Sequence, residues 1–168
     1  MMNTDTRLCI QTLGPQELSA ADDLACIMIA AWRAGFRGIL PDDTIGKYTC
    51  FAPCRDMFRQ ILRSGIGTMY LARVNGLAVG LLYWLEEGND ARIEALLTVP
   101  EVWGAGVAAG LMEQALTDAC NFQRVTVWPF AENHRARRFY EKQGFSPTGR
   151  SRMGDTEEIE YLRTPTKL

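Results

Sequence analysis

The sequence has few of the residues that build metal centres and disulfide frameworks. Its 168 residues include five scattered cysteines and a single histidine, His134. An odd number of cysteines without regular spacing is typical of reduced thiols in the cytoplasm. The close pair Cys50 and Cys54 has no second pair to complete a zinc site. We therefore expect no metal, and no cysteine nucleophile either, because no histidine is placed to activate one.

The sequence also lacks a charge excess and long apolar runs. A formal net charge of −2 gives no electrostatic basis for binding nucleic acid, which requires a basic surface. No apolar stretch reaches the roughly 20 residues that span a bilayer. The N-terminus has no basic segment followed by an apolar core, the pattern of a secretory signal. We therefore expect a cytoplasmic protein without nucleic-acid or membrane partners.

Turn residues divide the chain into alternating elements without an internal repeat, and its length suits a single domain over residues 1–168. In the first half, two strands meet at Asn75-Gly76, a pair that readily supplies the two positive φ angles of a type I′ turn. Successive hairpins indicate an antiparallel meander. We expect strands at 8–13, 68–74, 77–85 and 91–99, and helices at 18–34, 41–48 and 53–63.

In the second half of the chain, the spacing of the apolar residues alternates between that of a helix and that of a strand. The strand at 91–99, the helix after it and the strand at 124–128 form a βαβ unit, so these two strands should be parallel or splayed neighbours. The fold class is therefore α/β, with a mixed sheet and helices on both faces. The elements expected here are helices at 104–120 and 132–142 and strands at 124–128, 145–154 and 158–163.

A glycine-rich loop follows the strand that ends at Pro100. Gly104 and Gly106 lack Cβ atoms, and Ala108 and Ala109 keep the next turn small, so an anion can approach the backbone. Unpaired N–H groups and the helix dipole favour negative charge at such a helix N-terminus. These residues predict a phosphate site.

Two other interpretations of this loop stay open. Its glycines can simply allow tight packing of the helix on the sheet. The pattern Gly104-x-Gly106-x-x-Ala109 also matches the dinucleotide fingerprint. However, residues 100–103 separate it from the strand, and the acidic residue expected about 20 positions later is missing.

The helix at 132–142 carries a second motif. Asn133, Ala136 and Tyr140 are three and four residues apart, so they share one face of the helix. That face offers an amide, a small gap and a phenol to a slender ligand. Three arginines lie on other faces, as solvated surface or as positive charge beside a phosphate: Arg135, Arg137 and Arg138.

Three segments resemble the GNAT superfamily of N-acetyltransferases. Residues 96–108 are similar to its acetyl-CoA pyrophosphate loop, residues 133–145 to the motif that closes its site, and residues 31–41 to the first helix and loop of many bacterial members. With the order of the elements, the resemblance covers nearly the whole chain. It implies about seven strands, mostly antiparallel, with a splayed central parallel pair that admits pantetheine.

The resemblance further implies acetyl-CoA as co-substrate. The backbone of Leu97 and Val99 would bond pantetheine, and the Val99 N–H would polarise the thioester carbonyl. The loop amides would hold the pyrophosphate, Asn133 would contact the pantetheine arm, and Tyr140 would lie near the sulfur. The implied cofactor-binding residues are Leu97, Thr98, Val99, Gly104, Ala105, Gly106, Val107, Ala108, Ala109, Asn133, Ala136 and Tyr140.

The implied reaction is direct attack of a primary amine, of a small molecule or a protein, on the thioester. We assign Tyr140 as the acid for the leaving thiolate. We assign Glu94 as the base, because the alternation of Glu94 with Leu96 along the strand is compatible with one shared face.

Two residues depart from the pattern of the family. Trp128 occupies the position at which ribosomal-protein and N-terminal acetyltransferases have a general-base Glu, and Trp103 occupies a loop position at which the family commonly has Gln or Arg. A non-catalytic acyl-CoA-binding module and a dinucleotide enzyme are the alternatives.

The acceptor is less well defined by the sequence. Aromatic residues of the first helix and its loop, Trp32 and Phe36, predict an aromatic-lined acceptor side, with Tyr48 and Phe51 nearby. Core packing is the other explanation for aromatic residues at this spacing. The terminal strands make a homodimer plausible.

Overall fold

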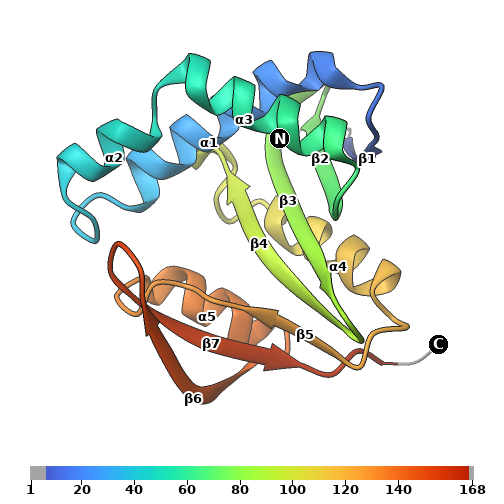
Figure 1. Cartoon of the computed structure of the whole chain (residues 1–168), viewed down its shortest axis with the longest axis vertical. Helices are drawn as coiled ribbons and strands as arrows, with labels where there is room; N and C mark the ends of the chain where they lie inside the picture. The colour runs from blue at the N-terminus through green and yellow to red at the C-terminus, as the bar shows by residue number, and fades with distance from the viewer. Residues whose placement is uncertain (1–6, 167–168) are drawn as a thin grey trace, which may run out of the picture.

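The computed structural model describes residues 7–166, which form a seven-stranded sheet in the order β1-β2-β3-β4-β5-β7-β6, with helices on both faces (Figure 1). Only β4 and β5 pair in parallel. The strands are β1 (Leu8–Leu13), β2 (Thr68–Val74), β3 (Leu77–Glu87), β4 (Asp90–Thr98), β5 (Arg124–Val127), β6 (Ser146–Met153) and β7 (Glu157–Arg163). The helices are η1 (Leu18–Ala20), α1 (Ala21–Gly35), α2 (Asp42–Tyr48), α3 (Phe51–Ser64), η2 (Pro100–Val102), α4 (Val107–Asp118) and α5 (His134–Lys142).

The expected elements are all present, and the mixed sheet is confirmed. Asn75 and Gly76 have φ angles of 51° and 82° between β2 and β3, as a type I′ turn requires. Helices α1, α2, α4 and α5 begin one to three residues later than expected. Helix α4 begins at Val107 rather than at 104, because Gly104 and Gly106 have φ angles of 77° and 86°, which a helix does not allow.

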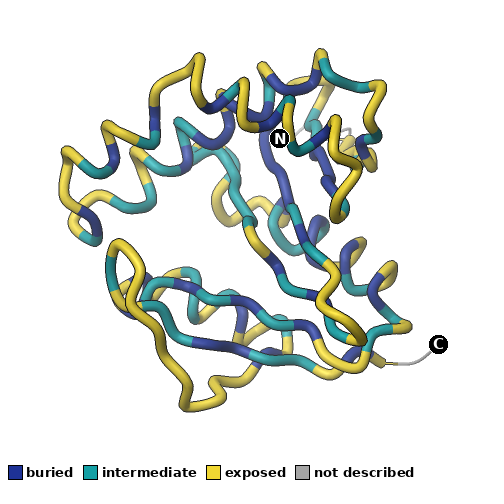
Figure 2. The backbone as a smooth tube through the Cα atoms, viewed as in Figure 1, coloured by how far each residue is buried: buried dark blue, intermediate teal, exposed yellow. Residues whose placement is uncertain are grey.

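Two apolar cores lie on opposite faces of the sheet. On one face α4 and α5 pack against strands from β2 to β7, and the predicted stripe of α4 is buried there. On the other face α1 and α3 cover only β1 to β4. Figure 2 shows the buried residues in dark blue along the central strands and the helices that cover them. Among the described residues no helix covers the second face of β5, β7 and β6, where paired arginines and glutamates of β6 and β7 lie together with Trp128. The stripe of α4 consists of Val107, Leu111 and Ala115, with Ala119 just after the helix.

Strands β4 and β5 separate after a short parallel ladder. Pairing runs from Asp90 with Arg124 to Ile93 with Val127, and β4 then continues beside β3 alone. Pro129 follows the end of β5 and has no N–H to extend a ladder. The resulting gap between the two strands is visible in Figure 1. It is the splay that the sequence predicts.

A β-bulge in β4 lies where the strands part. Tyr83 pairs with Ala95 and Trp84 with Ile93, which leaves Glu94 without a partner on β3. An extra residue of this kind re-aims side chains and is frequent beside active sites. Leu96 packs in the core beneath α4 and α5, whereas Ala95 and Leu97 pack towards α1 and α3.

Candidate functional site

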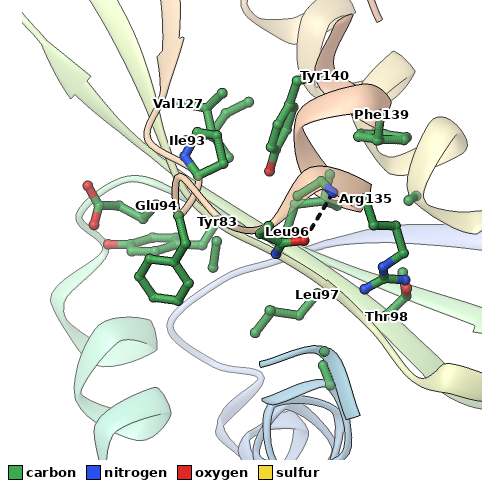
Figure 3. A pocket seen from close by; sticks show the side chains of 18 of the residues that line it. Tyr83, Ile93, Glu94, Leu96, Leu97, Thr98, Val127, Arg135, Phe139 and Tyr140 are labelled. Carbon is green, nitrogen blue, oxygen red and sulfur yellow. Dashed lines mark hydrogen bonds between the residues drawn. The ribbon is translucent and has the colours of Figure 1, made fainter. Parts of the chain in front are cut away.

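A cavity of about 900 Å³ opens at the gap between β4 and β5. Its walls come from α1, α3, β4, the loop before α4, the end of β5, α5 and the β6–β7 hairpin. Figure 3 shows side chains of β4, β5 and α5 converging on it. Segments that are up to 130 residues apart in the chain thus form one pocket, from Met28 to Glu158.

The loop before α4 forms one end of this pocket. Gly106 is the N-cap of α4 and offers no side-chain cap, so the first amides of the helix have no acceptor within it. A Cβ built on Gly104 or Gly106 would meet no protein atom within 4 Å. The space in front of these amides is therefore open, as an anion site requires.

A cation lies beside this loop. The guanidinium of Arg135, from α5, stacks 3.5 Å from the centroid of the Trp103 ring, and the Trp103 Nε1–H donates to the Thr98 carbonyl at 3.2 Å. Partial burial lowers the pKa of Arg135. Within residues 7–166 no carboxylate approaches this guanidinium within the 4.0 Å of an ion pair. The loop thus gains from α5 the positive charge that its own Trp103 lacks.

The other arginines of α5 differ in role. Arg137 donates to the Tyr161 hydroxyl at 3.1 Å and to the Ala131 carbonyl at 2.9 Å, which ties α5 to β7. Arg138 is exposed and lines the pocket. The sequence suggested either surface or phosphate-side charge for all three, and it contained no signal to separate them.

The second motif is assembled around the start of α5. Asn133 is the N-cap of the helix, and its Oδ1 accepts from the Ala136 N–H at 3.1 Å. Asn133, Ala136 and Tyr140 all line the pocket, so the face predicted from their spacing does form. The Tyr140 hydroxyl points into the cavity (Figure 3). Burial raises the pKa of Tyr140 well above its usual range, so the phenol stays protonated.

Glu94 also lines the pocket, but the geometry behind its assignment as base needs correction. The bulge places it on the α1 and α3 side, beside Tyr83, whereas Leu96 lies on the opposite face (Figure 3). Arg92 bridges two carboxylates, with Nη2 2.8 Å from Glu94 Oε1 and Nε 2.8 Å from Glu87 Oε1. Burial first, and then the charge of Glu94, raise the pKa of Tyr83. Glu94 is thus ion-paired.

The register of β4 corrects the expected backbone contacts. The Val99 N–H already donates to the Val79 carbonyl at 2.9 Å, so it is not free to polarise a thioester. In an antiparallel ladder, alternate residues bond the same neighbour. Leu97, opposite Leu81, therefore also turns its backbone groups to β3. Those of Leu96 and Thr98 face the gap instead, one residue away from the prediction.

The aromatic residues of the first helix separate into two groups. Trp32 and Phe36 line the pocket with ring centroids 4.9 Å apart, and Phe130, after β5, lies 4.9 Å from Phe36. Tyr48 packs 5.2 Å behind Trp32 and does not line the pocket. Phe51 is exposed outside the pocket. Phe130 follows a strand and has no helical spacing to the other aromatic residues, so no sequence pattern indicated it.

Neither a metal-binding cluster nor a membrane-spanning helix is present in the described part of the chain. Residues 7–166 contain no group of three or more His, Cys, Asp or Glu side chains placed to hold a metal ion. None of the helices formed there is both long enough and apolar enough to cross a bilayer.

Comparison with known proteins agrees with this geometry. The acetyltransferase (GNAT) family model matches residues 32–145. An uncharacterised N-acetyltransferase of Mycobacterium bovis is 26% identical over 150 residues, which cover 86% of this chain and 96% of that protein. Another, of Archaeoglobus fulgidus, is 32% identical over 105 residues, which cover 57% of this chain and 71% of that protein.

A solved structure with the same fold is that of the PaiA N-acetyltransferase of Thermoplasma acidophilum in complex with coenzyme A. It superposes with a TM-score of 0.78 at 15% sequence identity, and the match covers 94% of this chain and 99% of that one. The family match includes the loop before α4, the end of β5 and α5, which together surround the gap between the strands. The chain therefore belongs to the GNAT family and is an acetyltransferase.

Proposed function

We propose that this protein transfers an acetyl group from acetyl-CoA directly to a primary amine of a small molecule or a protein. The observation that carries the proposal is a continuous path through the pocket. The path starts at the uncapped amides of α4 and the unpaired Arg135 and ends at the Tyr140 hydroxyl in the gap between β4 and β5. The coenzyme A bound to the Thermoplasma acidophilum neighbour supports the same cofactor here.

The pocket suggests a position for each part of acetyl-CoA. The amides from Gly104 to Ala109 and the Arg135 guanidinium suit the pyrophosphate, because both offer positive potential to an anion. The backbone groups of Leu96 and the Thr98 N–H suit the pantetheine amides, which would pair with β4 as an added strand does, whereas the Thr98 carbonyl already accepts from Trp103. Asn133 keeps an NH2 group for the same arm while its oxygen caps α5. No metal takes part in the proposed reaction.

The chemistry requires a neutral amine and a stabilised leaving thiolate. An alkylammonium with a pKa near 10.4 must lose a proton, which costs about 4.6 kcal/mol at pH 7. Glu94, directly or through water, is the proposed acceptor of that proton, and its pairing with Arg92 holds it in place. Tyr140, whose raised pKa keeps the hydroxyl protonated, would donate a hydrogen bond to the thiolate.

A thiol-release assay with acetyl-CoA and a panel of primary amines tests the proposal. We expect thiol release that depends on the amine, together with a rise in the thermal midpoint with acetyl-CoA and none with NAD, because a ligand of the folded state stabilises it. Stabilisation by acetyl-CoA without turnover would identify a non-catalytic acyl-CoA-binding module. Stabilisation by NAD alone would identify a dinucleotide enzyme instead.

A further inference from the structure

The pocket has a second end, on the α1 and α3 side of the gap, which we call the acceptor chamber. One wall of the chamber is apolar. Met57, which is 39% exposed, and Ile61 of α3 lie along this wall with the stack of three aromatic rings. The rings meet edge to face, with centroids 4.9 Å apart in each contact. The stack consists of Trp32, Phe36 and Phe130.

The opposite wall carries arginine and carboxylate side chains that already pair with one another. Arg92 pairs with Glu94, and Arg152 pairs with Glu158 while its guanidinium lies 4.4 Å from the centroid of the Trp128 ring. Arg92 and Glu94 come from β4, whereas Arg152 and Glu158 come from β6 and β7, in the half of the sheet that no described helix covers. Glu87, the second partner of Arg92, does not line the pocket, so the two carboxylates of this wall, Glu94 and Glu158, each already have an arginine partner.

Asp155 is the exception among the carboxylates of the pocket. It lies in the β6–β7 turn and lines the cavity, and within residues 7–166 no basic group approaches it within 4.0 Å. One unpaired carboxylate matches one ammonium group. Additional ammonium groups would lose hydration without gaining a partner, which is unfavourable. A carboxylate on the acceptor would meet, on the wall opposite the rings, Arg92 and Arg152, which are already paired.

We infer that the acceptor is a monocationic primary amine carried on an aromatic or bulky apolar body, such as an arylalkylamine, rather than a polyamine, an aminoglycoside or a free amino acid. This inference rests on the proposed function. The apolar body would pack on the ring stack and Met57 while its ammonium group approaches Asp155. Glu94 would accept one proton of the ammonium group, and the amine nitrogen would then bond to the thioester carbon. The carbon–sulfur bond would break, and the second proton that the nitrogen loses would pass to the thiolate, which leaves as the thiol.

The test compares kcat/KM for phenethylamine, ethylamine, spermidine and lysine. Burial of a phenyl group should raise kcat/KM for phenethylamine over ethylamine about 10- to 100-fold, and both spermidine and lysine should be poorer than phenethylamine. Phe36→Ala should reduce the ratio of phenethylamine to ethylamine about tenfold. Phe51→Ala, which removes an exposed aromatic ring outside the pocket, is the matched control and should leave the ratio unchanged.

The outcomes separate the two proposals. Efficient acetylation of spermidine or lysine with little activity towards phenethylamine would overturn the inference and leave the acetyltransferase proposal standing. A preference for phenethylamine that survives Phe36→Ala would also overturn it. Release of thiol with none of the amines, while acetyl-CoA still stabilises the fold, would instead count against the proposed function.

Discussion

Substitution of Tyr140 should reduce the rate of acetyl transfer more than substitution of any other residue of the site. Its hydroxyl points into the pocket, and burial raises its pKa, so it acts as a hydrogen-bond donor rather than as an anion. We expect Tyr140→Phe to lower kcat about 100-fold, a typical contribution of a positioned proton donor. The KM for acetyl-CoA should change less than threefold. Steady-state kinetics across pH would measure both parameters.

Loss of structure must be separated from loss of chemistry in this variant. The phenyl ring of Tyr140→Phe keeps the packing against Phe139 and Phe145, whose centroids lie 5.5 and 5.8 Å from the Tyr140 ring. The thermal shift caused by acetyl-CoA should therefore match that of the wild type. Equal turnover of mutant and wild type at every pH would remove Tyr140 from the reaction.

Arg135 is the second residue with a specific expectation. Its unpaired guanidinium should contact a phosphate group of acetyl-CoA. We therefore expect Arg135→Ala to raise the KM for acetyl-CoA about tenfold, which is the effect of losing one hydrogen bond to a charged group. The effect should shrink at high salt, since the site is exposed. Activity with acetyl-pantetheine, which lacks the nucleotide pyrophosphate, should be unchanged.

Arg63→Ala is the matched control for this change. Arg63 is an exposed basic residue at the end of α3, outside the pocket. Its removal tests whether the general loss of positive charge weakens acetyl-CoA binding. An equal rise in KM for acetyl-CoA and acetyl-pantetheine in Arg135→Ala would contradict a phosphate contact.

At the scale of elements, the start of α4 determines access to the helix amides. Gly106 has a φ angle of 86°, and a Cβ there would meet no protein atom, so it would project into the space assigned to phosphate. Gly88 shares both features, with a φ angle of 63°, but lies in the β3–β4 turn. The two glycines form a matched pair in which only one faces the pocket.

Gly106→Ala and Gly88→Ala should each lower the free energy of unfolding by about 1–2 kcal/mol, the cost of a left-handed backbone for a residue with a Cβ. Only Gly106→Ala should also weaken acetyl-CoA binding, by tenfold or more. Urea titration and calorimetry measure the two quantities. Equal acetyl-CoA affinity in both variants would show that the loop amides do not hold the phosphates.

At the scale of the whole molecule, the free energy of unfolding should fall at alkaline pH because the fold buries two tyrosine hydroxyls. Burial raises the pKa of Tyr70 and Tyr140, whereas tyrosines in the unfolded chain ionise near pH 10. Above that pH the unfolded chain binds fewer protons than the folded one, so the free energy of unfolding falls as pH rises. Each such group contributes a slope of up to about 1.4 kcal/mol per pH unit.

Tyr140→Phe should therefore flatten the fall in stability above pH 10, although it leaves the profile between pH 7 and 9 parallel to that of the wild type. Chemical denaturation at a series of pH values measures the slope. Identical slopes above pH 10 in the two proteins would mean that Tyr140 ionises as easily in the folded state as in the unfolded one.

The sequence by itself determined the elements and their order. Residues that are close together in the sequence determine local backbone preference and the spacing of apolar side chains. These two properties account for the Asn75-Gly76 turn, the apolar stripe on α4 and the βαβ unit. The same holds for the face shared by Asn133, Ala136 and Tyr140, because a helix sets the spacing of its own side chains. The mixed α/β sheet was predictable for this reason, and the resemblance to the GNAT superfamily then implied the particular fold.

Only the tertiary structure decided how the site is assembled. The bulge at Glu94 and the register that turns Leu96 and Thr98 towards the gap depend on the pairing of β4 with β3, which no local pattern encodes. The stack of Arg135 on Trp103 joins residues 32 positions apart that meet only when α5 packs beside the loop. Contacts between distant segments depend on packing of the whole chain, and so they appear only in three dimensions.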